Sequence, residues 1–132
     1  MAIQLTNAGN DKILKNLLGV SSTTEPLILK LFENNATPSL VSDNSTFNEV
    51  VDDPGGYEAV ELTSTIWTIA GGIATTSPLI FTFQTFIGSV FGYYLVGKDS
   101  GEVIAAESFN TGAFRIANPG DSITITVSMS LN

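Results

Sequence analysis

Two pairs of carboxylates are the residues of this sequence whose type and spacing could support catalysis. Asp52 and Asp53 are adjacent, and Glu58 and Glu61 follow them in an acidic segment, residues 43–61. Paired carboxyl groups can serve as general acid and general base when a pocket removes one of them from water. This segment is rich in Ser, Asn, Pro and Gly, a composition typical of exposed loops. We therefore expect a solvated loop here and no catalytic residues.

Cation binding is a second use to consider for the same acidic segment. Carboxylates and backbone carbonyls in a loop with Gly turns are hard oxygen ligands that suit Ca²⁺. Their spacing matches no recognised calcium-binding loop. The sequence therefore predicts no metal site and no cofactor, and calcium in this segment stays an open alternative.

Composition removes most other catalytic chemistry. The chain contains no Cys and no His, which excludes thiol nucleophiles, disulfides and Cys/His zinc sites together with the commonest general base. Ser and Thr are abundant, but no motif supplies a base that would activate one of them. The pair Gly71-Gly72 indicates a turn between strands and not a phosphate-binding loop. We expect a protein that is not an enzyme.

Charge and hydropathy narrow the choice of partner. Thirteen acidic and five scattered basic residues give a net charge of −8, so a nucleic-acid phosphate would be repelled. The longest apolar stretch, Val90 to Val96, is interrupted by Gly92 and is far shorter than the roughly 20 residues of a membrane-spanning helix. The N-terminal residues also lack the pattern of a signal peptide. We expect neither nucleic acid nor membrane among the partners.

One short helix is predicted near the N-terminus. Its apolar residues fall on one face at helical spacing: Ile13, Leu14, Leu17 and Leu18. Asn7 or Asn10 could cap its start, and Gly19 is placed to end it. A helix of about a dozen residues is marginal in isolation, so its apolar face must pack on the body of this domain or on another chain. We favour a helix that closes one end of its own core, followed by a linker at residues 21–26.

From residue 27 onward, short apolar stretches are separated by Gly, Pro, Asn and Asp, the pattern of strands and turns. The predicted strands cover residues 27–32, 46–50, 59–62, 65–69, 80–86, 90–96, 103–109 and 123–131. The last one alternates most regularly, with an apolar residue at every second position from Ile123 to Leu131. These patterns predict an all-β protein, an antiparallel β-sandwich or jelly roll of about eight strands with a short N-terminal helix or arm. The expected division is residues 1–25 for the arm and 26–132 for the β-sandwich.

Aromatic residues are the remaining candidates for binding. Most are expected to fill the core of the sandwich. Tyr93 and Tyr94 are adjacent and must point to opposite faces of a strand, so we expect one in the core and the other exposed or at an interface. Trp67, the only Trp, could alternatively stack on a sugar ring from the surface of a sheet.

The order of these segments resembles a family of small structural proteins of tailed bacteriophages. The resemblance starts at residues 17–19 and continues through residues 27–38, residues 56–62 and Trp67. It continues with the landmarks at residues 81–83, 90–95, 99–101, 106–109 and 119–126. Nearly the whole chain is covered, and the weight of the resemblance lies in the order of its strand and turn motifs.

The resemblance implies a jelly-roll-like particle component, a capsid decoration (cement) protein on the outer surface of the virion, made in the cytoplasm of the bacterial host. Its partner would be the major capsid protein, and it would be a homo-oligomer, a dimer or trimer. The alternative is a tail- or fibre-associated module that binds a receptor or glycan. The candidate partner-contacting residues are Ile3, Leu5, Ile13, Leu14, Leu17, Leu18, Trp67, Tyr93 and Tyr94. Among them the N-terminal arm is the preferred docking element.

Overall fold

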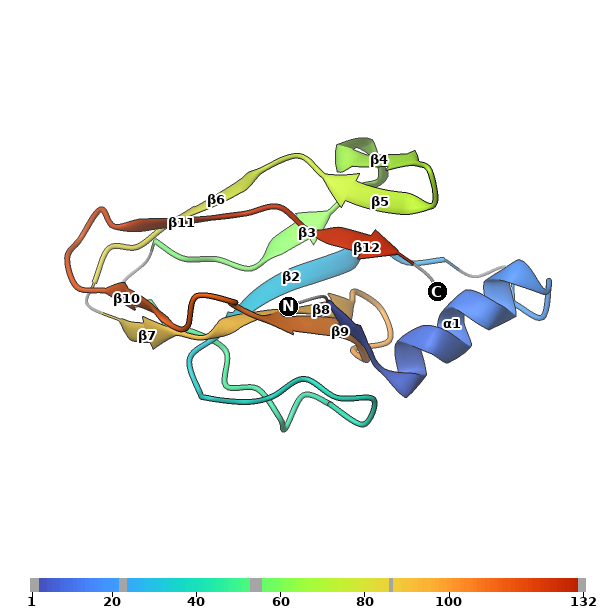
Figure 1. Ribbon diagram of the computed structural model, residues 1–132, viewed down its shortest axis with the longest axis horizontal. Helices are drawn as coiled ribbons and strands as arrows, with labels where there is room; N and C mark the ends of the chain where they lie inside the picture. The colour runs from blue at the N-terminus through green and yellow to red at the C-terminus, as the bar shows by residue number, and fades with distance from the viewer. Residues whose placement is uncertain (1–2, 22–23, 53–55, 86, 131–132) are drawn as a thin grey trace.

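The computed structural model describes residues 3–21, 24–52, 56–85 and 87–130 of the chain. Within these residues one α-helix, one short 3-10 helix and twelve strands follow one another (Figure 1). They are β1 (Gln4–Leu5), α1 (Asn7–Leu17), β2 (Leu27–Phe32), β3 (Val60–Leu62), η1 (Ser64–Ile66), β4 (Trp67–Ala70), β5 (Ile73–Thr76), β6 (Leu79–Thr82), β7 (Gly88–Val90), β8 (Gly92–Gly97), β9 (Val103–Ser108), β10 (Phe114–Ile116), β11 (Ser122–Ile125) and β12 (Ser128–Ser130). The fold is all-β with a short N-terminal helix, as predicted.

The largest sheet has five antiparallel strands in the order β1-β9-β8-β2-β3. The hairpin of β8 and β9 forms its centre, and β2 pairs with β8 over six residues, from Leu27 opposite Gly97 to Phe32 opposite Gly92. At one edge Gln4 and Leu5 of β1 pair with β9. The chain before the helix is therefore part of the same sheet as the body of the protein.

The remaining strands form a long antiparallel ribbon that bends over this sheet. Its three paired segments are β7 with β10, β6 with β11, and β5 with β12, and β4 extends the last pair to three strands. Backbone hydrogen bonds bridge the interruptions between segments, including Phe83 N to Asp121 O at 2.9 Å and Ile87 N to Ile116 O at 3.2 Å. The antiparallel all-β expectation is confirmed, whereas these pairings do not establish a jelly roll.

The predicted last strand is two strands, because the ribbon bends between β11 and β12. At the bend the backbone N–H of Val127 donates to the buried hydroxyl of Thr76 at 3.0 Å. The predicted alternation still holds: Ile123, Ile125 and Val127 are buried, and Thr124 and Thr126 between them are exposed. Leu131 lies outside the described residues. The other additional strands are β1, β5, β7 and β10, which the sequence patterns do not predict.

The main core lies between the five-stranded sheet and the ribbon. The sheet contributes Leu29, Leu31 and Leu95, and the ribbon contributes Phe83 and Ile125 among others. Leu29, Leu31, Phe83 and Leu95 are fully buried. Side chains at every second position of a strand face the same side, so strands from both layers direct apolar side chains into this one interior.

A second apolar cluster covers the opposite face of the five-stranded sheet. The rings of Phe32 and Phe47 lie 4.7 Å apart, and those of Phe47 and Tyr94 lie 4.8 Å apart in a stacked arrangement. Phe47 comes from the segment of residues 33–50, which runs below the sheet in Figure 1. A strand predicted at residues 46–50 is wrong: the pairing there is an isolated bridge between Phe32 and Glu49.

The prediction that one of Tyr93 and Tyr94 is exposed is therefore also wrong. Tyr93 is 2% exposed and faces the main core, while Tyr94 is 3% exposed and faces the second cluster. The two side chains do point to opposite faces of β8, but both faces of that strand are covered. Neither ring is presented to a partner.

Candidate interaction surface

Helix α1 is anchored to the body at its N-terminal end. Thr6, not the predicted Asn7 or Asn10, caps the helix: its hydroxyl oxygen accepts from Gly9 N at 3.0 Å, and its O–H donates to the Val103 carbonyl at 2.5 Å. This one side chain satisfies a free N–H of the first turn and ties the helix to β9. At the other end Gly19 has a φ of 73°, the left-handed conformation that ends the helix as predicted.

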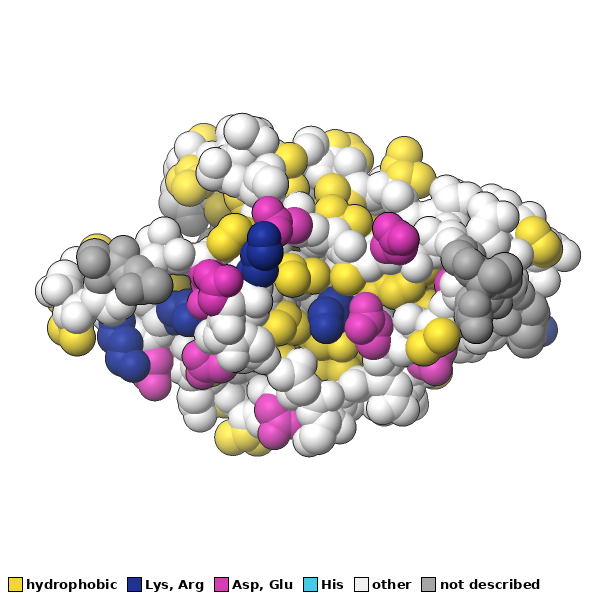
Figure 2. Space-filling model, turned by 180° about the vertical axis from the view of Figure 1, so that it is seen from behind, with side chains coloured by type: hydrophobic (Ala, Val, Ile, Leu, Met, Phe, Trp, Pro, Cys, Tyr) yellow, Lys and Arg dark blue, Asp and Glu magenta, His cyan; other side chains and the backbone are white. Residues whose placement is uncertain are grey.

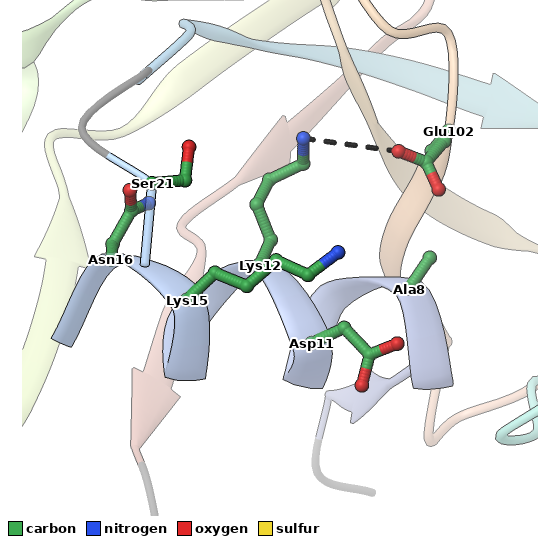
Figure 3. Close-up of a pocket in the computed structure, with 7 residues that line it drawn as sticks. All are labelled: Ala8, Asp11, Lys12, Lys15, Asn16, Ser21 and Glu102. Carbon is green, nitrogen blue, oxygen red and sulfur yellow. Dashed lines mark ion pairs between the residues drawn. The ribbon is translucent and has the colours of Figure 1, made fainter. Parts of the chain in front are cut away.

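Close packing and two ion pairs fix the side of α1 that faces the body. Gly9 is its buried residue, and a Cβ there would overlap the carbonyl oxygen of Ile104. The ammonium of Lys12 lies 3.4 Å from a carboxylate oxygen of Glu25 and 3.8 Å from one of Glu102. Figure 3 shows Lys12 reaching from the helix toward Glu102 above it. The polar side of this helix therefore points toward its own protein.

Glu25 reinforces this attachment from residues predicted to be a linker. Its Oε1 accepts from the N and Oγ of Ser100, at 3.2 and 2.9 Å, in the turn between β8 and β9. Burial raises the pKa of the Glu25 carboxyl, but the Ser100 hydrogen bonds and the charge of Lys12 outweigh burial and leave that pKa below its ordinary value. Its contribution to stability is present above the ordinary pKa of a Glu and is lost as the pH falls through the lowered native pKa.

The apolar side of α1 faces solvent. Leu17 is 74% exposed, Leu18 is 70% exposed, and Val20 just beyond the helix is 73% exposed. Leu14 is about half exposed, and Ile13 is partly buried. The expectation that this face closes the end of its own core is wrong, because the close approach at Gly9 and the Lys12 ion pairs direct the opposite side of the helix inward. The polarity of the helix is thus inverted relative to an ordinary surface helix.

The other predicted partner-contacting residues are part of the two apolar clusters: Tyr93 lies in the main core and Tyr94 in the second cluster. Ile3, Leu5 and Trp67 are partly buried and pack against the main core. Trp67 also lines a groove of 550 Å³ that includes Leu27 and Leu62. Among all the predicted contact residues, the structure brings only the leucines of α1 to the surface as a group.

Asp52 is buried, which differs from the solvated loop expected for the acidic segment. Asp52 is 7% exposed, and its two carboxylate oxygens accept four hydrogen bonds, from Tyr57 N, Gln84 N, Thr85 N and Thr85 Oγ1, at 2.6 to 3.1 Å. Burial raises the pKa of Asp52, but these hydrogen bonds outweigh burial and lower that pKa overall. With both oxygens occupied, Asp52 is a structural acceptor. Asp53 lies outside the described residues.

Other acidic residues of the segment bind neighbouring side chains. Glu61 lies 2.6 Å from the ammonium of Lys98, and Glu49 lies 3.6 Å from that of Lys30. Glu49 also accepts from the hydroxyl of Tyr57 at 2.9 Å. In the described part of the chain, no group of three or more acidic residues is arranged to hold a metal ion. In the same residues, no helix has the length and hydropathy to cross a membrane.

A charge-free layer is the surface feature that sequence reasoning missed. Residues 62–97 and 122–132 contain no Asp, Glu, Lys or Arg, and the structure assembles β4, β5, β6, β11 and β12 from these stretches. We call these five strands the neutral layer. Figure 2 shows only white and yellow atoms along the upper rim of the molecule, where β4 and β5 lie. Ile69, Ile73 and Ile80 are its exposed large apolar residues. Both uncharged stretches could have been found in the sequence, but only the fold places them together.

Comparison of the chain with protein-family models, with curated proteins and with solved structures gives no match.

Proposed function

We propose that this protein is a capsid decoration protein of a tailed bacteriophage, which binds the major capsid protein on the outer surface of the shell through the apolar face of α1. The observation that carries the proposal is the inverted helix. Leu14, Leu17 and Leu18 face solvent while Lys12 on the opposite side binds the body of the protein. A helix held in this orientation presents its apolar face to another molecule, as in the binding of amphipathic helices to apolar grooves.

The resemblance in segment order implies the major capsid protein as the partner, and the structural features favour binding over catalysis. The best candidate for a catalytic carboxylate, Asp52, has both oxygens occupied by hydrogen bonds from the protein itself. An all-β body with an anchored, outward-facing helix suits a protein that occupies a site between shell subunits. Contacts formed only on the assembled shell would stabilise that state by mass action.

The size of the apolar face predicts weak single contacts. Fully burying a Leu or Val side chain contributes about 1.5–3 kcal/mol, and the four exposed side chains at positions 14, 17, 18 and 20 are already partly covered. Docking of α1 alone therefore contributes several kcal/mol before the loss of translational and rotational freedom is subtracted. Firm attachment would need an oligomer that makes several such contacts with the shell at once. After the first contact forms, the others form at high effective concentration, so weak contacts together give tight binding.

The helix is tested by binding of variants to phage heads built from the corresponding major capsid protein. We expect the double variant Leu17→Asn, Leu18→Asn to lose binding while keeping its folded β-sheet spectrum, because both residues are exposed. Ile80→Asn is the matched control, since Ile80 is 68% exposed but lies on β6, away from the helix. Undiminished binding by the helix variant would overturn the proposed role of α1.

A tail-associated glycan-binding module is the second candidate, favoured by the groove beside Trp67. Copy number separates the two functions, because a shell protein is present in hundreds of copies per particle and a tail protein in a handful. Densitometry of purified particles measures it. We expect a ratio to the major capsid protein typical of a shell component, and a handful of copies would refute the decoration function.

A further inference from the structure

The neutral layer ends in an unprotected strand. Strand β4 pairs with β5 on one side, and the strand order β12-β5-β4 places no further strand beside it among the described residues. Native proteins commonly protect such edges with Lys, Pro, a bulge or a covering segment, because a free edge is a template for another strand. The sequence of β4, Trp67-Thr68-Ile69-Ala70, contains no charged residue and no Pro. Its β-branched and aromatic residues favour strand pairing.

The turn after β4 determines which backbone groups point to the free edge. Gly71 and Gly72 have φ values of 59° and 78°, the pattern of a two-residue type I′ hairpin turn, which Ala70 and Ile73 flank as a hydrogen-bonded pair. In an antiparallel ladder such pairs alternate with non-hydrogen-bonded ones. Ile69 and Trp67 therefore form no backbone hydrogen bonds with the residues of β5 opposite them. Their N–H and C=O groups point away from β5, toward the free edge of the sheet.

An independent hydrogen bond agrees with this alternation. Thr76 is the residue of β5 opposite Trp67, and its N–H donates to Val127 O at 3.0 Å on the side away from β4. The free edge of β4 thus offers alternating donors and acceptors at Trp67 and Ile69. The Ile69 side chain is 76% exposed beside them.

The charge distribution of the chain indicates which molecule could pair with the free edge of β4. Each chain has a net charge of −8, so two copies repel each other through any surface that contains the acidic residues. The neutral layer is the part of the described structure where they can meet without bringing like charges together. A strongly charged partner would find no complementary charge on these strands. A second copy of this chain therefore fits the edge.

We propose that two copies pair β4 with β4 in antiparallel orientation across a twofold axis, so that the two β12-β5-β4 sheets become one six-stranded sheet. Such an interface is self-complementary, as twofold symmetry requires. The outward groups at Trp67 and Ile69 allow two registers in which three residues of β4 pair with β4 of the other copy, one centred on Thr68 opposite Thr68 and one on Ile69 opposite Ile69. This inference does not depend on the capsid function, because the pairing forms in solution without a shell.

Sedimentation velocity of the full chain over a wide range of concentrations tests the dimer. We expect a monomer–dimer equilibrium that shifts toward the dimer as salt is added, because screening reduces repulsion between the acidic copies. Ile69→Lys should weaken association at least about tenfold, and Ile80→Lys is the control with the same change in charge and a similar exposure. A chain that stays monomeric at all salt concentrations, forms trimers, or dissociates equally with both variants overturns the proposal.

Single cysteines provide a second measurement that does not require the lysine variant to fold. The chain contains no Cys, so Thr68→Cys and Ile69→Cys each introduce one thiol near the twofold axis. Directly opposed residues of antiparallel strands lie within reach of a disulfide. We expect one of the two variants to form a covalent dimer under mild oxidation faster than Ile80→Cys. Equal rates for all three variants would refute the pairing, whatever the particle-binding assay shows.

Discussion

Replacing Asp52 tests how a carboxylate in a polar, loop-like segment comes to stabilise the fold. Its Oδ2 accepts from Tyr57 N at 2.7 Å and from Gln84 N at 3.0 Å, and its Oδ1 accepts from Thr85 N at 3.1 Å and Thr85 Oγ1 at 2.6 Å. Asp52→Ala removes all four acceptor interactions. Asp52→Asn keeps one oxygen, and its amide can turn toward Thr85, whose hydroxyl can also accept.

The geometry predicts a larger loss of stability for Asp52→Ala than for Asp52→Asn. A hydrogen bond to a charged acceptor contributes about 1.5–3 kcal/mol, and an unsatisfied buried donor is costly. Tyr57 is buried, whereas Gln84 and Thr85 are exposed enough for water to accept some of the hydrogen bonds that they lose with Asp52. We therefore expect Asp52→Ala to lower the free energy of unfolding by about 3–4 kcal/mol and Asp52→Asn by about 1–2 kcal/mol.

Urea unfolding followed by the fluorescence of Trp67, the only Trp, measures both effects. The series is run from neutral pH into acid. Because the pKa of Asp52 is lowered in the native state, its stabilisation is complete above the ordinary Asp pKa and is lost as the pH falls through the native pKa. Wild type and Asp52→Asn should therefore approach each other in acid.

Asp43→Asn is the matched control. Asp43 also accepts several hydrogen bonds, from Ser45 and Thr46, but it is exposed within its own turn. We expect this control to change stability little at neutral pH. Equal destabilisation by the Asn substitutions at positions 43 and 52, or a difference between wild type and Asp52→Asn that persists unchanged into acid, would refute the argument from burial.

Two further predictions concern the buried aromatic residues. Phe47→Ala should lower the free energy of unfolding by about 3–5 kcal/mol, because the Phe47 ring packs against Phe32 and Tyr94 in the second cluster. Thermal or urea unfolding measures this loss. Leu40→Ala, at a half-exposed position of the same segment, is the control and should change stability little. In ultraviolet titration no tyrosine should ionise near the ordinary pKa, because burial raises the pKa of Tyr94 to about 12 and raises those of Tyr57 and Tyr93 further. A tyrosine whose pKa is higher in the folded than in the unfolded chain loses its contribution to stability as the pH rises through the folded pKa. Phenolate absorbance should therefore appear together with alkaline unfolding. Reversible ionisation of a folded chain near pH 10 would contradict the buried positions of these side chains.

Local patterns were sufficient for several elements. The six-residue strand β2 has the predicted bounds, and α1 ends shortly before Gly19, a residue that adopts positive φ without steric cost. The alternation from Ile123 to Val127 correctly identified the buried face. These features depend on neighbours along the chain, so their signals are present in the sequence.

Other features depend on contacts between distant residues. Tyr94 is buried because Phe47 folds across the sheet, and Asp52 is buried because the backbone of residues 84 and 85 donates to it. The leucines of α1 form the amphipathic face that the sequence predicts, but its orientation is set by Gly9 against β9 and by Lys12 between Glu25 and Glu102. Helical periodicity defines a face and does not say toward what that face is turned.

The all-β class, the short helix with its apolar face, and the absence of Cys and His chemistry all follow from the order and types of the residues. The outward direction of the helix face, the cover on both faces of β8, and the meeting of two uncharged stretches in the neutral layer with β4 at its edge arise only in the folded chain. Composition and periodicity are properties of neighbouring residues. Orientation, burial and charge distribution arise when residues far apart in the chain compete for the same interior.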